Sequence, residues 1–230
     1  MIYLVRHGQS EWNLLRRTQG QIRHPALTAL GRGQARRAAA VIAAHSGMIG
    51  QEVGSVVTSD LVRAAQSAAI VAAALAVRSR VDRRWREQGF GRLEGLGYDL
   101  TSPEVEALAA DPDVAVGGGE TDRAVTERAL AALSDLDSSA STVVVTHGDT
   151  IRHLLGHLVG IAPGADLSQL LPNGTVIAVD RGTGGWGGVP GGSASAAVCD
   201  PPIGTEQGRG SQLSYTRAAP SRTWRAVSSI

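Results

Sequence analysis

The sequence predicts an α/β fold in which helices cover a mostly parallel β-sheet. Met1 to Val5 and Thr142 to Thr146 are apolar, Val-containing runs, and a His-Gly pair follows each of them closely. Such runs are typical of buried strands that stop at the edge of a sheet. Val53 to Thr58 is a further β-branched run. Ala-rich segments with helical spacing separate these runs, and alternating strands and helices indicate a parallel sheet.

The first half of the chain is expected to supply three strands and two helices. After the first strand, Gln9 to Ala26 is polar and irregular, which indicates a long loop. Thr28 is a suitable N-cap for an Ala/Arg-rich helix that ends near His45. A second helix is expected from Asp60 through Leu75, because an acidic side chain is favourable near a helix N-terminus. Arg78 to Asp82 is expected to form a short strand.

The second half begins with a loop and continues with helices and strands. Trp85 to Gly97 is rich in glycine and charge and follows neither the helical nor the strand period, which predicts a shaped loop. A short helix is expected to begin at Pro103, since proline is favoured in a first helical turn, and to end near Asp111. The remaining elements expected are helices over Thr121 to Leu136 and Asp149 to Val159, the strand Thr142 to Thr146, and a strand over Thr175 to Val179 after the turn Pro172-Asn173-Gly174.

Composition divides the chain after Asp180. Residues 1–180 read as one domain, whereas residues 181–230 are rich in Gly, Ser, Pro and Arg without a period, which predicts a flexible tail. Cys199 is the only cysteine, so no intrachain disulfide can form. No signal-peptide pattern is found, and the longest apolar run is about half of the ~20 residues of a membrane-spanning helix, so a cytoplasmic protein is expected.

The first candidate site lies just beyond the first strand, at Arg6, His7 and Gly8. An imidazole there can act as a nucleophile if one ring nitrogen is free and the other is held. The guanidinium of Arg6 suits phosphate oxygens, and Gly8 would let the backbone approach a ligand closely. Taken alone, a histidine in the position of His7 is more often structural than catalytic.

Three further candidates lie at other strand and loop ends. Arg63 is expected in the first turn of a helix, where backbone amides also bind anions, although a solvated arginine is the simpler alternative. Glu87 in the shaped loop can protonate a leaving alkoxide, with Glu94 as its rival. His147, which precedes Gly148, is a second imidazole able to donate to a phosphoryl group. His153 and His157 have metal-ligand spacing, but no third ligand accompanies them, so no metal is expected.

Together and in this order, these motifs resemble the histidine phosphatase superfamily, in its phosphoglycerate-mutase-like branch. The resemblance covers roughly Met1 to Asp180. It implies a three-layer sandwich with a mixed, mostly parallel central sheet flanked by helices. It also implies a phosphate pocket of Arg6, Arg63, His7 and His147. The other motif residues that carry it, expected to bind or support the substrate, are Gly8, Asn13, Gln19, Gly20 and Gly148.

The same resemblance implies a two-step phosphoryl transfer without metal or cofactor. His7 would attack phosphorus, Glu87 would protonate the leaving oxygen, and water would then hydrolyse the phosphohistidine. Glu87 matches the acid position of the family, and the nearby Glu94 keeps that assignment open. About sixty residues separate Glu87 from His147, too few for a lid that excludes water, which favours a phosphatase. A phosphoglycerate mutase-like phosphotransferase and a non-catalytic phosphate-ligand binder are the alternatives.

Substrate choice is expected to depend on the loop Gln21 to Pro25 and on Tyr98 to Val116. Arg23 and His24 in the first of these could contact the alcohol part of the substrate or a second anionic group, and simple surface exposure explains them equally well. The expected partner is a small-molecule phosphate ester, with no nucleic acid and no membrane, because the formal net charge is only +1. A homodimer is left open.

Overall fold

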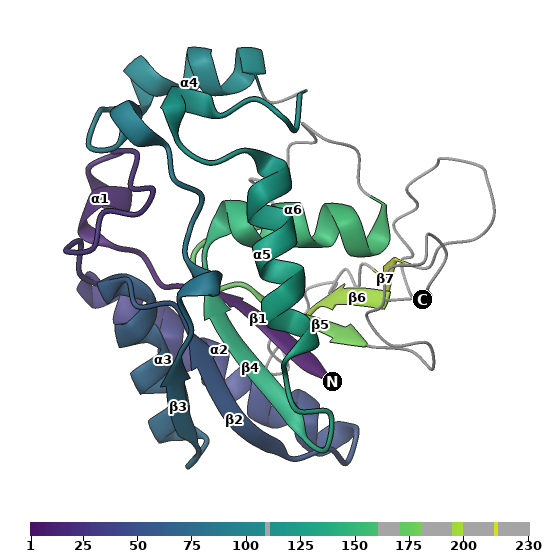
Figure 1. The fold of residues 1–230 in the computed structure, drawn as a ribbon. Helices are drawn as coiled ribbons and strands as arrows, with labels where there is room; N and C mark the ends of the chain where they lie inside the picture. Colours follow the sequence, from purple (N-terminus) through teal and green to yellow (C-terminus); the bar gives the residue numbers. More distant parts are fainter. Residues whose placement is uncertain (109–110, 161–170, 181–194, 200–213, 216–230) are drawn as a thin grey trace, which may run out of the picture.

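The computed structural model describes residues 1–108, 111–160, 171–180, 195–199 and 214–215. Within these residues seven strands form one sheet, in the order β3-β2-β4-β1-β5-β6-β7, with helices on both faces (Figure 1). Strands β3, β2, β4 and β1 are parallel to one another, and β5, β6 and β7 follow in antiparallel pairs. The strands are β1 (Ile2–Arg6), β2 (Val53–Thr58), β3 (Arg78–Val81), β4 (Ser141–Thr146), β5 (Val176–Asp180), β6 (Ser195–Val198) and β7 (Ser214–Tyr215).

The helices confirm the predicted layered α/β arrangement. They are α1 (Glu11–Leu14), α2 (Ala29–Met48), α3 (Val62–Ala74), α4 (Tyr98–Leu108), α5 (Asp122–Ser134) and α6 (Gly148–Val159). Three short 3-10 turns, η1 (Arg83–Trp85), η2 (Gly91–Leu93) and η3 (Val116–Gly118), lie in the connections between β3 and α5. The mixed sheet between helices is therefore the fold that the sequence predicts, although its three parallel strand pairs are matched by three antiparallel ones in the described residues.

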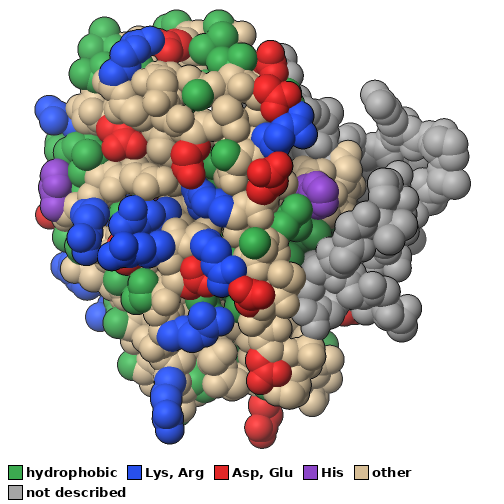
Figure 2. Space-filling view, viewed as in Figure 1, with side chains coloured by type: hydrophobic (Ala, Val, Ile, Leu, Met, Phe, Trp, Pro, Cys, Tyr) green, Lys and Arg blue, Asp and Glu red, His purple; other side chains and the backbone are tan. Residues whose placement is uncertain are grey.

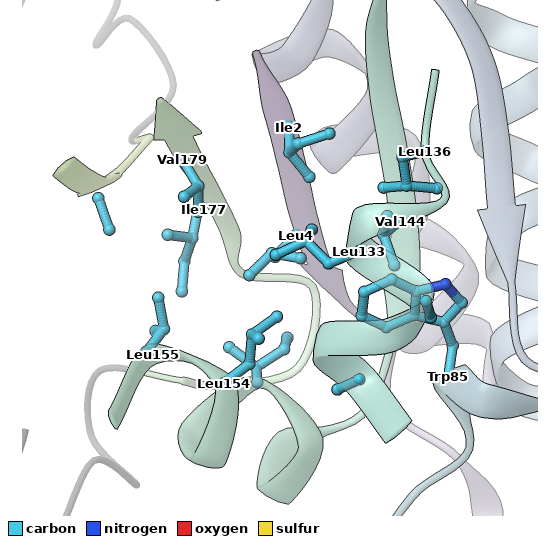
Figure 3. Packing of buried hydrophobic residues seen from close by; sticks show 14 of the residues in the cluster. Ile2, Leu4, Trp85, Leu133, Leu136, Val144, Leu154, Leu155, Ile177 and Val179 are labelled. Carbon is cyan, nitrogen blue, oxygen red and sulfur yellow. The ribbon is translucent and has the colours of Figure 1, made fainter. Parts of the chain in front are cut away.

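Side chains of the central strands alternate between two cores. Ile2 and Leu4 of β1 belong to the core on the α5 and α6 side, which also contains the fully buried Trp85 (Figure 3). Tyr3 and Val5 point to the opposite face, where they pack with the Ala-rich buried sides of α2 and α3. This period of two is the geometry of a strand that is covered on both faces. Both cores fix the position of β1, and so of the residues that follow it.

The helix starts show where local signals decide the structure and where they do not. Thr28 caps α2 as predicted, because its side chain accepts a hydrogen bond from the Gly31 amide at 3.0 Å. The helix expected to begin at Asp60 begins at Val62 instead. The Asp60 carboxylate pairs with Arg86, at 2.5 Å, and with Arg83, at 3.5 Å. These ion pairs to the loop after β3 take Asp60 away from the helix end.

One loop prediction and one helix prediction also need correction. The stretch from Gln9 to Ala26 contains α1, which is held by a capping box between Ser10 and Asn13. Helix α4 starts at Tyr98, so Pro103 lies inside it and not at its beginning. The Tyr98 amide donates to the Arg16 carbonyl at 2.9 Å, which anchors the start of α4 five residues earlier than the proline indicates.

Regular structure continues beyond Asp180. Strand β6 pairs with β5, and its Ala196 is buried in the α5 and α6 core. Residues 181–194, 200–213 and 216–230 of the predicted tail lie outside the described residues. In the part of the chain that the structure describes, no helix has both the length and the apolar character to cross a membrane.

Candidate active site

The two candidate histidines occupy equivalent positions at the ends of neighbouring parallel strands. Arg6, the last residue of β1, is the register partner of Thr146, the last residue of β4. The His7 amide donates to the Thr146 carbonyl at 2.9 Å and so continues this pairing by one residue. As a result the rings of His7 and His147 lie 5.1 Å apart between centroids, at 62° to each other. Both side chains are buried.

A single backbone contact fixes the protonation pattern of the His7 ring. Nδ1 lies 2.7 Å from the carbonyl oxygen of Gly8, and because a carbonyl only accepts, Nδ1 carries the proton. The lone pair is therefore on Nε2, which makes no hydrogen bond to any residue that the structure describes. Burial, followed by the charges of Arg63 and Arg6, holds the pKa of His7 well below its usual value. The ring is neutral near pH 7 and has a free nucleophilic nitrogen.

Two arginines supply positive charge beside the histidines. Buried Arg63 donates to the carbonyl oxygens of Gly20, at 2.7 Å, and Ile22, at 2.9 Å. Arg6 donates through Nη1 to the carbonyl oxygen of Leu171. Burial lowers the pKa of Arg63 to about 10, against the opposing charges of Glu87 and Glu94, so it stays a cation at neutral pH.

Buried nitrogen atoms without a hydrogen-bond partner collect at this point. Four buried side-chain polar atoms lack a hydrogen-bond partner among the described residues, and three of them belong to the site: Arg6 Nε, Arg63 Nε and His147 Nδ1. Buried N–H groups without an acceptor are costly and rare in folded proteins. Two of these three groups are parts of permanent cations, so an anion is the ligand that would satisfy them.

Glu87 lies against the N-terminus of α6. One of its carboxylate oxygens accepts from the amide of Thr150 at 3.1 Å, and the other is 3.4 Å from the amide of Asp149. Burial and the charge of Asp149 raise the pKa of Glu87, while Arg63 acts in the opposite direction. A buried carboxyl with a raised pKa beside two arginines is suited to giving and taking a proton.

The rival carboxylate, Glu94, has a different environment. Its Oε1 accepts from the backbone amides of Gln21, at 2.9 Å, and Phe90, at 3.0 Å. It therefore joins two loops by bonds to backbone, whereas Glu87 contacts the first turn of α6, next to His147. This placement favours Glu87 as the acid.

These residues match a known family. The model of the histidine phosphatase superfamily (branch 1) matches residues 2–189. The chain belongs to the histidine phosphatase superfamily. Its relatives include Probable phosphoglycerate mutase GpmB of Klebsiella pneumoniae subsp. pneumoniae, which is 32% identical over 193 residues, covering 80% of this chain and 86% of the relative.

Solved structures agree with this membership of the histidine phosphatases. A mycobacterial glucosyl-3-phosphoglycerate phosphatase in complex with VO3 is 28% identical and has a TM-score of 0.63, covering 78% of this chain and 91% of the other. A protein named Mycobacterial hydrolase 1 is 28% identical and has a TM-score of 0.66, covering 80% of this chain and 91% of the other.

Two glycines of the histidine phosphatase site, Gly8 and Gly148, lie where other atoms pass too close to leave room for a side chain. A Cβ on Gly148 would lie 3.2 Å from the guanidinium carbon of Arg6, so glycine lets Arg6 lie beside the second histidine. Gly8 was expected to admit a ligand, but a Cβ there would lie 2.1 Å from the Gly31 carbonyl oxygen. Its amide donates to Ser67 Oγ at 3.1 Å. Gly8 therefore faces α2 and supports His7, and that amide is already occupied.

The predicted substrate-binding residues of the first loop act mainly on their neighbours. Gln19 is buried and accepts a hydrogen bond from Ser10 Oγ at 2.7 Å. Gly20 has a positive φ of 47° and provides a carbonyl that holds Arg63. The side-chain oxygen of Asn13 caps α1 and lies 3.3 Å from Nδ2 of Asn173. Among these side chains, Asn13 is the one connected to the edge of the site, because Asn173 also donates to the His7 carbonyl at 3.1 Å.

Arg23 and His24 remain on the surface. The His24 ring makes an edge contact with Trp12, 5.2 Å between centroids. The Arg23 carbonyl accepts from the Val62 amide at 3.1 Å, at the start of α3. Within the described residues neither side chain forms a hydrogen bond to the histidines or arginines of the site, so their expected role in substrate choice stays a prediction.

Sequence reasoning assigned no role to two residues that support the site, Ser59 and Arg128. Ser59 Oγ lies 2.7 Å from His147 Nε2, and its position directly after β2 was the available signal. Arg128 of α5 donates to the carbonyl oxygens of Arg84 and Arg86, both at 2.7 Å, and of Glu87 at 3.0 Å. No local pattern marks this role of Arg128, because these three carbonyl groups lie more than forty residues away in the sequence.

Outside the candidate site, His153 and several arginines are paired with neighbouring side chains. His153 is buried between Gln88, at 3.0 Å, and Asp122, at 3.3 Å, and its pKa falls to about 4 because of burial and Arg152. Over the described residues, no group of three or more His, Cys, Asp or Glu side chains is placed to hold a metal ion. On the surface in Figure 2, arginines lie beside acidic side chains. The ion pairs of the described residues include Arg83–Asp60, Arg84–Asp82 and Arg86–Asp60.

Proposed function

We propose that this histidine phosphatase hydrolyses phosphate monoesters of small molecules through a phosphohistidine on His7. The observation that supports this most directly is the His7 ring itself: the Gly8 carbonyl holds Nδ1 at 2.7 Å, and Nε2 is left with its lone pair. Three buried nitrogens without a partner among the described residues accompany it: the N–H donors Arg6 Nε and Arg63 Nε, and His147 Nδ1. A phosphoryl group offers acceptor oxygens to such donors and an electrophilic phosphorus to the nucleophile.

In the first step the lone pair of His7 Nε2 attacks phosphorus and the ester P–O bond breaks. The leaving alkoxide takes a proton from Glu87, whose raised pKa favours the protonated form that this step needs. Arg6, Arg63 and His147 stabilise the charge on the equatorial oxygens, which is the main contribution that a protein makes to phosphoryl transfer.

In the second step water attacks the phosphohistidine. The Glu87 carboxylate takes a proton from that water, the P–N bond breaks, and Nε2 regains its lone pair. The product is inorganic phosphate, and both His7 and Glu87 return to their starting states.

The chain between Glu87 and His147 supports hydrolysis of the phosphohistidine over transfer of the phosphoryl group back to the substrate, which is the step that a mutase needs. In the described part of this interval α5 is committed to the core, where Ala129 and Leu133 are buried. Helix α4 packs on the small cluster of Phe90, Leu93 and Val116. Within the described part of this interval little chain is left to close over the intermediate, which favours access of water to it. A mutase is the second candidate, because curated relatives at 32% and 33% identity are named probable phosphoglycerate mutase.

Glu87 supports an enzyme over a phosphate-binding protein. Binding phosphate needs the cations and the N–H donors, but it has no use for a buried carboxylate beside them, since like charges repel. Keeping such a group is useful where a proton must move.

The test is to incubate the full chain with a panel of phosphorylated sugars, phosphorylated sugar acids and p-nitrophenyl phosphate, and to measure the release of phosphate. Mixtures quenched during turnover should contain a phosphohistidine at residue 7 by mass spectrometry, and His7→Ala should lose both the adduct and the activity. Interconversion of 2- and 3-phosphoglycerate without net phosphate release would instead establish the mutase. Retained hydrolysis in His7→Ala would overturn the proposal.

A comparison of leaving groups tests the acid. An alkoxide must be protonated as it leaves, whereas p-nitrophenolate leaves without help. Glu87→Gln should lower turnover of an alkyl phosphate by about a hundredfold or more, the usual value of general acid catalysis. Formation of the phosphohistidine from p-nitrophenyl phosphate should change much less. Glu94→Gln is the matched control, and equal effects of the two substitutions on both substrates would reject Glu87 as the acid.

A further inference from the structure

Ser59 and His147 form a buried pair behind the candidate phosphate site. Ser59 directly follows β2 and His147 directly follows β4, and these two strands are parallel neighbours in the sheet. Ser59 Oγ lies 2.7 Å from His147 Nε2, and neither side chain is exposed. The contact is therefore set by strand pairing and is shielded from water.

The direction of this hydrogen bond follows from the groups around the Ser59 hydroxyl. The Leu61 amide donates to Ser59 Oγ at 3.4 Å, which uses one of the two lone pairs of that oxygen. The hydroxyl also has a proton to donate, and among the described residues Nε2 of His147 is the acceptor within reach, at 2.7 Å. A ring nitrogen that accepts a hydrogen bond has no proton, and in a neutral imidazole the proton must then be on Nδ1.

A doubly protonated His147 is the competing state, and the surroundings oppose it. Burial, followed by the charges of Arg63, His7, Arg128 and Arg6, lowers the pKa of His147 well below its usual value. The ring is therefore neutral near pH 7, and the choice is between its two tautomers.

The second ring nitrogen of His147, Nδ1, faces different surroundings from Nε2. It is buried and has no hydrogen-bond partner among the described residues. The His147 ring lies 5.1 Å from that of His7 between centroids, so the second histidine is a direct neighbour of the proposed nucleophile. With a proton, Nδ1 is a donor that an anion would satisfy. With a lone pair it would repel the same anion.

We propose that Ser59 is a positioning residue that fixes His147 as the Nδ1–H tautomer, so that the ring donates a hydrogen bond to a phosphoryl oxygen. The proposal rests on the proposed function only in taking the anion to be a phosphoryl group. Ser59 itself does not touch the substrate. It acts through the ring in the way that a second partner commonly sets the tautomer of a catalytic histidine.

The decisive measurement is the tautomer of His147 in the full chain. Nitrogen-15 NMR of histidine-labelled protein distinguishes a protonated from an unprotonated ring nitrogen, and His147→Asn identifies the signal among the six histidines of the sequence. Wild-type protein should show a proton on Nδ1 and none on Nε2. A proton on Nε2, or on both nitrogens at pH 7, would overturn the proposal, and no variant is needed to obtain this result.

Variants then connect the tautomer to anion binding, with inorganic phosphate as the probe. Ser59→Ala should bind phosphate about tenfold more weakly, the scale of one hydrogen bond to a charged group, and should show mixed tautomers. Ser59→Cys keeps a weak donor and should recover part of the loss. Ser55→Ala, on the same strand β2 but away from His147, should match wild type. Unchanged phosphate affinity and tautomer in a folded Ser59→Ala protein would contradict the proposal.

These readouts separate this inference from the proposed function. Tautomer and phosphate affinity are measured without turnover, so they remain valid if no ester in the panel is hydrolysed. Conversely, a phosphohistidine on His7 with an Nε2-protonated His147 would leave the proposed function standing and remove the role of Ser59.

Discussion

Arg128 donates a hydrogen bond from Nη2 to the carbonyl oxygen of Glu87, at 3.0 Å. The same guanidinium donates to the carbonyl oxygens of Arg84 and Arg86, at 2.7 Å each, and pairs with Glu120 at 2.9 Å. One side chain of α5 therefore holds the backbone that leads into the proposed acid. Only a planar group with several donors can make these bonds together.

Arg128→Lys should lower kcat by about tenfold to a hundredfold, because a small displacement of a catalytic group has an effect of that size. Lysine keeps the charge but cannot reach several carbonyls at once. Added guanidinium should restore part of the kcat of Arg128→Ala, which a merely destabilised protein would not show. Arg123→Ala is the control, since that side chain lies on the same helix and pairs with the exposed Asp113. A kcat of Arg128→Lys equal to wild type would disprove the positioning role.

The pH dependence of kcat/KM tests the environment of Glu87. The first step needs protonated Glu87, so activity falls as pH rises through its pKa. Burial and the charge of Asp149 raise that pKa. Although burial opposes ionisation of Asp149, the charge of Arg152 lowers its pKa, so Asp149 is charged near neutral pH. Asp149→Asn should therefore lower the pKa of Glu87 and move the alkaline limb of the profile to lower pH.

The control for this shift is Asp135→Asn, which removes a carboxylate that pairs with Arg84. It should leave the alkaline limb in place. If Asp149→Asn moves the limb to higher pH, or leaves it unchanged, Asp149 does not set the protonation of the acid.

Removal of metal ions is a simpler test. In the proposed mechanism Arg6, Arg63 and the His147 ring stabilise the transferring group, and these groups need no metal to be cationic or to donate. Hydrolysis by protein treated with EDTA should equal that of untreated protein. Loss of activity that magnesium or zinc restores would show that a metal takes part and would require another mechanism.

The central part of the site could be predicted because its signals are local. His7 and His147 each follow an apolar run closely, and parallel strands end at one edge of the sheet, so two residues far apart in sequence were expected to meet. The ring separation of 5.1 Å agrees with this expectation. Arg63 and Glu87 were candidates from their own segments, and the resemblance to the family implied that they share one site with the two histidines, which no composition or period would give.

What could not be predicted depends on contacts between distant segments. Asp60 was expected to start a helix, but ion pairs with Arg83 and Arg86 decide its place. Strand β6 is four residues long within a Gly- and Ser-rich region, and it forms because β5 offers an edge. In both cases tertiary contacts outweigh the local preference, and no window of the sequence contains them.

The glycines of α2 provide a matched pair for a stability test. A Cβ on Gly31 would lie 2.1 Å from the carbonyl oxygen of Gln9, whereas nothing lies within 4 Å of a Cβ on Gly33. Gly31→Ala must push α2 away from the segment after His7, which should lower the free energy of unfolding by about 1–3 kcal/mol, the typical cost of overpacking. Gly33→Ala should raise it by about 0.5–1 kcal/mol, because alanine is the better helix former. Urea unfolding measures both, and the turnover of Gly31→Ala should also fall, since Gln9 lies two residues from His7. Equal stability of the two variants would show that the Gly31–Gln9 contact relaxes freely and does not hold the first histidine in place.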